Sequence, residues 1–140
     1  MQVCLFDIDG TLVDTGGAGQ VAMESGLARC FGIERPTEGI STVGRSDRAI
    51  AEDLLAFHGL EASTALLQQF LEAYLAELPA QLARLDGLTL PGVPVLLERL
   101  AERDDIVLGL LTGNFIQGAR HKLAHFGLDR FFERDGELFG

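Results

Sequence analysis

VCLFDIDGTLVDT, residues 3–15, begins with an apolar run that ends in two aspartates, Asp7 and Asp9, followed at once by Gly10. A continuous apolar run, as opposed to an alternating one, is typical of a strand buried in a parallel sheet. Ligands of open α/β sheets bind beyond the carboxyl ends of such strands. The stretch therefore predicts a parallel α/β sheet, with two carboxylates where a binding site is expected.

A second apolar run, IVLGLL at residues 106–111, is followed by Thr112, Gly113 and Asn114. It has the same continuous hydrophobicity as the first run. If the two strands are neighbours in a parallel sheet, their carboxyl ends lie at one edge. The polar groups that follow the two runs are then expected to face one crevice.

The chain between the two runs has helical apolar spacing. It is much longer than the single helix of a simple right-handed crossover, so part of it is expected to form a separate lobe. We predict an α/β core from residues 1–14 and 87–140, divided by a helical insertion at residues 15–86. The helices expected in the insertion span residues 16–31, 47–58 and 64–78, with Pro79 kinking or ending the last one.

The chain after residue 86 carries two more helical patterns and one irregular stretch. Apolar spacing predicts helices at residues 93–103 and 116–126. In the tail, Asp135 and Gly136 form a turn signal, and one short strand is expected near Phe131. Two convincing strands are fewer than the roughly five to six of an average open sheet. We therefore expect a polypeptide truncated at its C-terminus.

The composition is that of an ordinary globular domain, with 140 residues, 47% of them hydrophobic and 23% charged. No apolar stretch approaches the length of a membrane span. The run from Val3 to Phe6 is too short for the apolar region of a signal peptide, so a cytoplasmic protein without a membrane partner is expected. Cys4 and Cys30 lack CxxC spacing and are interpreted as reduced thiols.

The formal net charge of −10 at pH 7 argues against nucleic acid as a partner, because such a chain repels the phosphate backbone. The same charge favours cations, and a bound divalent metal would then recruit an anionic substrate. Lys122 is the single lysine among the 11 basic residues. It lies in the helix expected after Asn114, where it is a candidate functional cation.

The side chains at the two strand ends have the chemistry of a phosphoryl-transfer site. Two carboxylates and a backbone carbonyl at Asp7 and Asp9 form a hard oxygen site suited to Mg²⁺. The metal would neutralise the carboxylates and a phosphate, so that one carboxylate can attack phosphorus. Thr112 offers a hydroxyl and Gly113 an amide to phosphate oxygens, and Lys122 can supply a compensating positive charge.

FDIDGTLVDT at residues 6–15, LLTGN at residues 110–114 and the downstream Lys122 together resemble the motifs of the haloacid dehalogenase-type hydrolases. The first motif, DxDGTLxD, is highly specific. The resemblance implies a Rossmann-like core, with a helical cap domain inserted at residues 15–86.

The resemblance also implies a role for each motif residue. Asp7 would be the nucleophile that becomes an aspartyl-phosphate, and Asp9 the acid that protonates the leaving group and then activates water. Mg²⁺ would be held by the Asp7 carboxylate and the Asp9 carbonyl. Thr112 would bind the phosphoryl group and Lys122 would stabilise its charge. Dehalogenases of this family lack the second aspartate, so Asp9 indicates phosphoryl transfer.

VGRSDRAI at residues 43–50 is similar to the cap segment of phosphoglycolate phosphatase-like members of the family. In that position Arg45 would reach the distal end of the substrate. Gly113 and Asn114 are expected at the substrate as well, although Asn114 either orients neighbouring groups there or only caps the following helix.

One element of the family pattern has no counterpart. The fourth motif, an acidic pair after another strand, is not found after Lys122, because Asp129 and Asp135 follow no apolar strand. This supports the expected truncation, and it predicts weaker metal binding and slower turnover in this chain than in a longer parent.

The function expected from the sequence is a Mg²⁺-dependent phosphatase that hydrolyses a small phosphorylated metabolite, acting as a monomer or a homodimer. A sugar phosphomutase that uses the same aspartyl-phosphate is one alternative, and it would return the phosphoryl group to a sugar. A catalytically incompetent fragment that serves as a binding module is the other.

Overall fold

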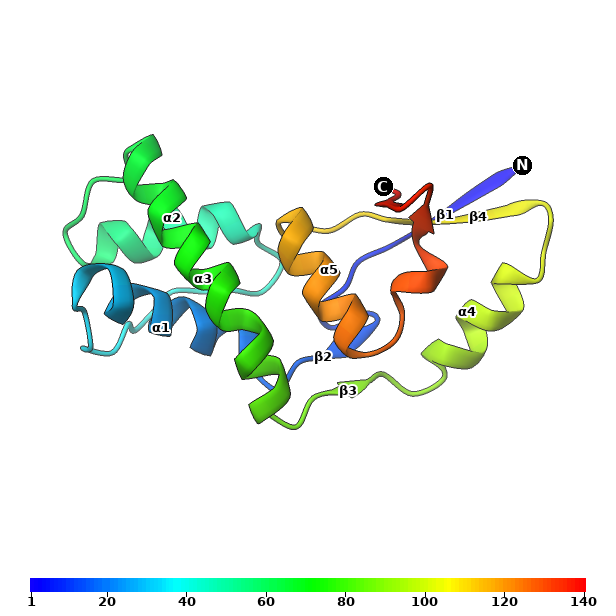
Figure 1. The fold of residues 1–140 in the computed structure, drawn as a ribbon, viewed down its shortest axis with the longest axis horizontal. Helices are drawn as coiled ribbons and strands as arrows, with labels where there is room; N and C mark the ends of the chain where they lie inside the picture. Colours follow the sequence, from blue (N-terminus) through cyan, green and yellow to red (C-terminus); the bar gives the residue numbers. More distant parts are fainter.

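The computed structural model describes all residues from 1 to 140. Strands β1 (Gln2–Phe6) and β4 (Ile106–Leu110) form a parallel pair in which Gln2 lies opposite Ile106 and Phe6 opposite Leu110. Figure 1 shows this pair at one end of the molecule and helices α1 to α3 at the other. The predicted α/β class, with the two apolar runs as neighbouring parallel strands, is confirmed.

Strand β1 is less buried than its sequence predicts. Val3 is 56% exposed and Leu5 is 51% exposed, whereas the alternate residues Cys4 and Phe6 are partly buried. The two partly buried side chains pack on one face of the strand pair, where the sheet cluster described below lies. The expectation of burial on both faces is therefore wrong for β1, because only one of its faces is covered.

The predicted boundaries of the insertion lie side by side. Strand β2 (Val13–Asp14) pairs antiparallel with β3 (Leu88–Thr89), so the chain leaves for the helices and returns from them at one place. The approach is close enough to require a glycine, since a Cβ on Gly87 would lie 2.6 Å from the Asp14 carbonyl oxygen.

Three helices follow β2, namely α1 (Ala18–Phe31), α2 (Asp47–Phe57) and α3 (Thr64–Arg84). Serine hydroxyls cap the second and third, with Ser46 accepting from the Ala49 amide and Ser63 from the Leu66 amide, each at 3.2 Å. Pro79 lies within α3, so the prediction that the helix ends there is wrong. The alternative prediction, that Pro79 kinks the helix, stays a prediction. The helix continues because its last turns bury apolar residues on both sides of the proline.

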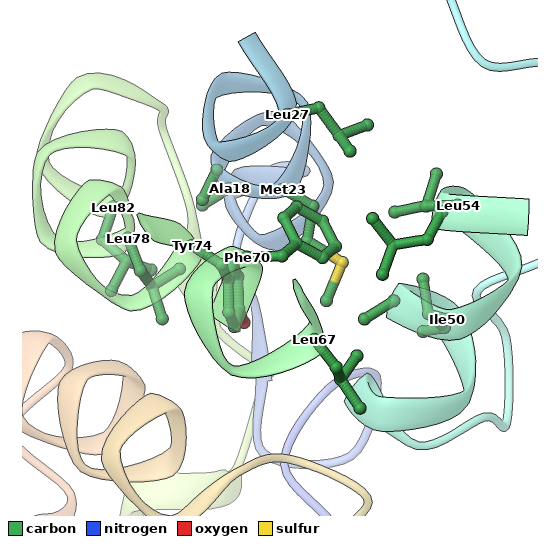
Figure 2. Packing of buried hydrophobic residues seen from close by; sticks show 13 residues of the cluster. Ala18, Met23, Leu27, Ile50, Leu54, Leu67, Phe70, Tyr74, Leu78 and Leu82 are labelled. Atoms are coloured by element: carbon green, nitrogen blue, oxygen red, sulfur yellow. The ribbon is translucent and has the colours of Figure 1, made fainter. Parts of the chain in front are cut away.

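Two hydrophobic clusters hold the chain together. The helical cluster comes from α1, α2 and α3, and Figure 2 shows its side chains meeting between these helices. It contains Ala18, Ala22, Met23, Leu27, Ile50, Ala51, Leu54, Leu55, Leu67, Phe70, Tyr74, Leu78 and Leu82. The sheet cluster lies around the strand pair and contains Ile8, Leu12, Val13, Val93, Leu97, Leu108, Leu110, Ala119, Leu123, Leu128 and Phe132.

The remaining elements are α4 (Val93–Ala101), α5 (Ile116–His125), the 3₁₀ helix η1 (Asp129–Phe131) and the short strands β5 (Glu133–Arg134) and β6 (Glu137–Leu138). The strands pair as a hairpin around Asp135 and Gly136, whose φ angles of 52° and 80° confirm the predicted turn. Phe131 itself lies in the 3₁₀ helix, and the short strand expected near it is β5, which begins two residues later. None of the helices is both long and apolar enough to cross a membrane.

Candidate active site

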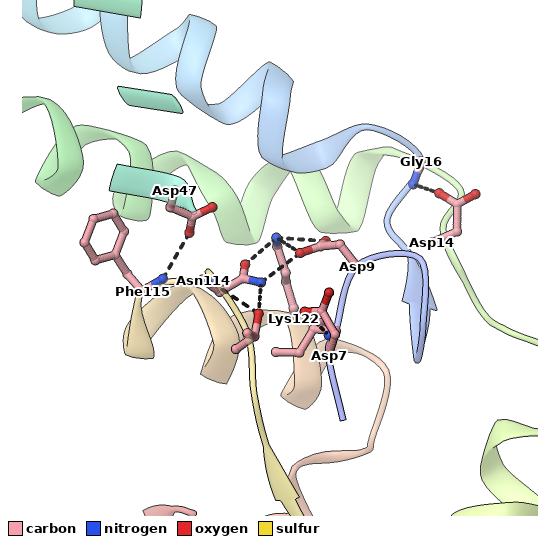
Figure 3. Close-up of polar contacts among 10 residues, drawn as sticks. Asp7, Asp9, Asp14, Gly16, Asp47, Asn114, Phe115 and Lys122 are labelled. Carbon is pink, nitrogen blue, oxygen red and sulfur yellow. Dashed lines mark hydrogen bonds and ion pairs between the residues drawn. The ribbon is translucent and has the colours of Figure 1, made fainter. Parts of the chain in front are cut away.

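The loops after β1 and β4 meet at the carboxyl edge of the strand pair, as the parallel pairing requires (Figure 3). Asn114 joins them, because its Nδ2 donates to Oδ2 of Asp9 at 2.8 Å and to Oγ1 of Thr112 at 2.7 Å. The Asn114 amide also donates to the Thr112 hydroxyl oxygen, at 3.2 Å. The Thr112 oxygen thus accepts from Asn114, which leaves its O–H free to donate to a ligand.

Lys122 reaches the same place from helix α5. Its side chain is almost completely buried, and its Nζ donates to both carboxylate oxygens of Asp9 at 2.9 Å and to Oδ1 of Asn114 at 2.6 Å. These contacts use all three donors of the ammonium group, as a buried cation requires. The only lysine of the sequence therefore lies at the strand ends, and it is not a solvated surface residue.

Asp7 and Asp9 have different surroundings. The Asp9 carboxylate is 47% exposed and is held by Lys122 and Asn114. The Asp7 carboxylate is exposed, and it accepts only the amide of its own neighbour Ile8, at 2.8 Å. Its second oxygen has no protein partner, so Asp7 is the carboxylate that is open to a ligand.

The start of helix α2 packs directly against the loop after β4. The Asp47 amide donates to the Gly113 carbonyl at 2.8 Å, and the Asp47 Oδ2 accepts from the Phe115 amide at 3.0 Å (Figure 3). The approach leaves no room for a side chain at Gly113, where a Cβ would lie 2.7 Å from the Cα of Ser46. These contacts fix the conformation of the loop that carries Asn114.

The Asp47 carboxylate is a site residue that the sequence does not reveal. It is 7% exposed, and burial raises its pKa, an effect that Lys122 and the Phe115 amide partly offset. In the sequence it is recognisable only as an acidic residue in the first turn of a helix, and nothing there indicates a partner almost seventy positions away.

A cavity of about 480 Å³ lies between the strand ends and the helices α1, α2, α3 and α5. Only 5 of its 21 lining residues are hydrophobic, and Asp7, Asp9, Thr112 and Lys122 are among the others. Gly113, Asn114 and Arg45 line it as well. A polar cavity of this size suits a small hydrophilic ligand.

Arg45 lines the cavity, and its guanidinium already forms an ion pair within the protein. Its Nη1 pairs with Oδ2 of Asp53 at 2.6 Å and donates to the Ser41 carbonyl at 3.3 Å. The expectation that it binds the distal end of a substrate stays a prediction, and in such a complex the guanidinium would share itself between Asp53 and the ligand.

The donors at the strand ends fit a magnesium ion that keeps part of its water shell. No group of three or more histidine, cysteine, aspartate or glutamate side chains could by itself hold a metal. Mg²⁺ is however commonly bound through one or two carboxylates together with substrate phosphate and water. The open Asp7 carboxylate and the neighbouring Asp9 carbonyl are donors of this kind.

Comparison with known proteins gives a family match over nearly the whole chain. The family model for haloacid dehalogenase-like hydrolases matches residues 1–137. No curated protein matches the sequence.

Solved structures match the fold. A protein described as a predicted phosphoglycolate phosphatase, from Haemophilus somnus, superposes with a TM-score of 0.65 at 19% identity, over 94% of this chain and 59% of its own. A haloacid dehalogenase-like family hydrolase from Streptococcus pneumoniae superposes with a TM-score of 0.56 at 19% identity, over 95% of this chain and 59% of its own. The chain thus spans under two thirds of the length of these structures.

Proposed function

Because this chain belongs to the haloacid dehalogenase-like hydrolases, we propose that it is a phosphatase that hydrolyses a small phosphorylated metabolite through an aspartyl-phosphate. The unequal surroundings of the two aspartates carry this proposal. Asp7 presents an oxygen without a protein partner to the cavity, while Asp9 is held by Lys122 and Asn114. Such a pair separates the group that attacks from the group that moves protons.

In the first half-reaction an Asp7 oxygen attacks phosphorus, and the bond from phosphorus to the ester oxygen breaks. Asp9 gives its proton to the departing oxygen, so an alcohol leaves. In the second half-reaction Asp9 takes a proton from water as the water oxygen attacks phosphorus. The bond between Asp7 and phosphorus then breaks, which releases phosphate and restores the Asp7 carboxylate and the protonated Asp9.

The other residues bind and orient the phosphoryl group. The Thr112 O–H and the Gly113 amide would donate to its oxygens, and Lys122 would balance its charge. Asn114 holds Asp9 toward the cavity through the bond at 2.8 Å. Mg²⁺, held by the Asp7 carboxylate and the Asp9 carbonyl, would supply charge neutralisation between that carboxylate and the phosphate.

Residues 15–86 are proposed to act as a cap over this site, attached to the core of residues 1–14 and 87–140 through β2 and β3. Support comes from the cavity, which is lined both by the strand ends and by residues of the helical segment such as Arg45. A cap of this kind would exclude water other than the attacking molecule. The cytoplasmic location and the monomeric or homodimeric state stay predictions.

The direct test is phosphate release from a generic aryl phosphate with Mg²⁺, for the unchanged chain and for Asp7→Asn. Asparagine keeps the shape of Asp7 but cannot form the acyl-phosphate, so we expect a loss of at least about 1000-fold, the scale on which removing a nucleophile acts. Equal rates in the two proteins would show that Asp7 is not the nucleophile. Isomerised product in place of free phosphate, from a bisphosphorylated sugar, would favour the phosphomutase.

A further inference from the structure

Tyr74 is a buried residue whose hydroxyl has no partner. It lies in helix α3 within the helical cluster and is fully buried, and its hydroxyl is the one buried side-chain polar atom without a hydrogen bond. Figure 2 shows its ring between Leu78 and Phe70, with the oxygen directed away from Leu27. Because buried polar groups are nearly always satisfied, an unpaired one calls for a ligand or a functional reason.

The hydroxyl lies beside the candidate active site. Tyr74 lines the same cavity as Asp7 and Lys122. A Cβ built on Gly19 would lie 3.7 Å from the Lys122 Nζ and 3.9 Å from the Tyr74 hydroxyl, so these two groups border one small space. A Cβ on Gly118 of α5 would lie 3.7 Å from the same hydroxyl. Tyr74 therefore spans the distance from the helical cluster to the strand ends.

The hydroxyl is poised as a donor. Burial, together with the carboxylates of Asp47 and Asp9, raises the pKa of Tyr74 above its ordinary value, so the group stays protonated. Lys122 is itself a donor and cannot accept from it, and no protein acceptor lies within hydrogen-bond distance of the hydroxyl. An anionic oxygen of a bound ligand would supply the acceptor that the Tyr74 hydroxyl lacks.

We propose that the Tyr74 hydroxyl donates a hydrogen bond to a phosphoryl oxygen of the bound substrate. Helix α3 then contributes a substrate-binding residue, and the ligand itself links the helical segment to the strand ends. This inference rests on the proposed function, because it assigns a further contact to the same site. The ligand it requires is a tetrahedral oxyanion, either inorganic phosphate or a phosphate monoester.

The composition makes the test direct. Tyr74 is the only tyrosine and the chain has no tryptophan, so tyrosine emission reports this one ring. Titration of the unchanged chain with inorganic phosphate is expected to change that emission. Tyr74→Phe is expected to weaken phosphate affinity and to raise KM for an aryl phosphate about tenfold, the scale of one hydrogen bond to a charged oxygen. Its melting temperature should be unchanged or higher, because the variant removes an unpaired buried hydroxyl.

A matched control removes another hydroxyl from the same helix. Thr64→Val lies at the exposed start of α3 and makes no side-chain hydrogen bond that would be lost, so it should leave affinity and KM unchanged. Unaltered affinity and KM in Tyr74→Phe, with emission insensitive to phosphate, would overturn the proposal while leaving the phosphatase in place. If the unchanged chain hydrolyses no ester, the proposed function fails, yet emission and phosphate affinity still decide the role of Tyr74. If it binds no phosphate, the proposed role of Tyr74 fails, and hydrolysis of the ester alone decides the proposed function. If Tyr74→Phe does not fold, the emission of the unchanged chain decides the role of Tyr74.

Discussion

The contact between helix α2 and the loop after β4 predicts that two substitutions of Asp47 differ in their effect on stability. Its Oδ2 accepts from the Phe115 amide at 3.0 Å, and its carboxylate is 7% exposed. Asp47→Ala leaves that amide without an acceptor in a partly buried place, which costs about 1–3 kcal/mol of unfolding free energy. For a chain of this length the melting temperature should fall by roughly 3–10 °C. Asp47→Asn keeps an acceptor oxygen and removes the buried charge, so it should not lower stability at pH 7.

The two variants also differ from the unchanged chain in their pH dependence. Burial raises the pKa of Asp47 above its ordinary value of 3.8, so at pH values between the two the folded chain holds a proton there that the unfolded chain has lost. This contribution to stability is greatest below pH 3.8 and is lost as pH rises through the raised pKa. Asp47→Asn should therefore gain on the unchanged chain as pH rises from 4 to 7. Urea unfolding at a series of pH values measures this, and a gap that stays constant, or an alanine variant as stable as the unchanged chain, would refute the reasoning.

Two further predictions concern charged groups. Lys122→Met should lower kcat at least about 100-fold, because it removes the cation that binds Asp9 and would balance the phosphoryl charge, and steady-state kinetics with melting curves would separate this from unfolding. A kcat near that of the unchanged chain would contradict the assigned role. Burial and the nearby Arg35 lower the pKa of His58 below its ordinary value of 6.5. Stability should therefore decline as pH falls below about 6.5, because the unfolded state takes up a proton there. His58→Gln should flatten this decline in a melting-temperature series, and an unchanged slope would count against it.

Much of the candidate site could be predicted from the sequence, because its parts sit at positions fixed by local pattern. Asp7 and Thr112 each follow an apolar run, and parallel pairing of the runs is enough to bring them together. Lys122 is indicated by being the only lysine, and its bonds to Asp9 and Asn114 explain how a buried cation is stabilised there. In both cases the information lies in the residue itself and its immediate neighbours in the chain.

The rest depends on how the helices pack. Asp47 and Tyr74 look in the sequence like a helix-start acid and a member of an apolar stripe, and only the packing of α2 and α3 on the strand ends gives them further contacts. Pro79 does not end α3, because burial of the last turns of the helix outweighs the loss of one amide donor. The burial predicted for Val3 and Leu5 is wrong, because an apolar side chain shows that a position can be buried and not whether that face of the strand is covered.

The pairing of β2 with β3 has a consequence for how this architecture can be altered. Asp14 and Leu88 face each other as partners in an antiparallel ladder, so a two-residue turn could join them into a hairpin. All the chain from Thr15 to Gly87 is therefore inserted at a point where its two ends are already adjacent. Exchanging that segment for another helical module should keep the strand register of β1 and β4, but it would remove the Asp47 contacts that fix the loop carrying Asn114.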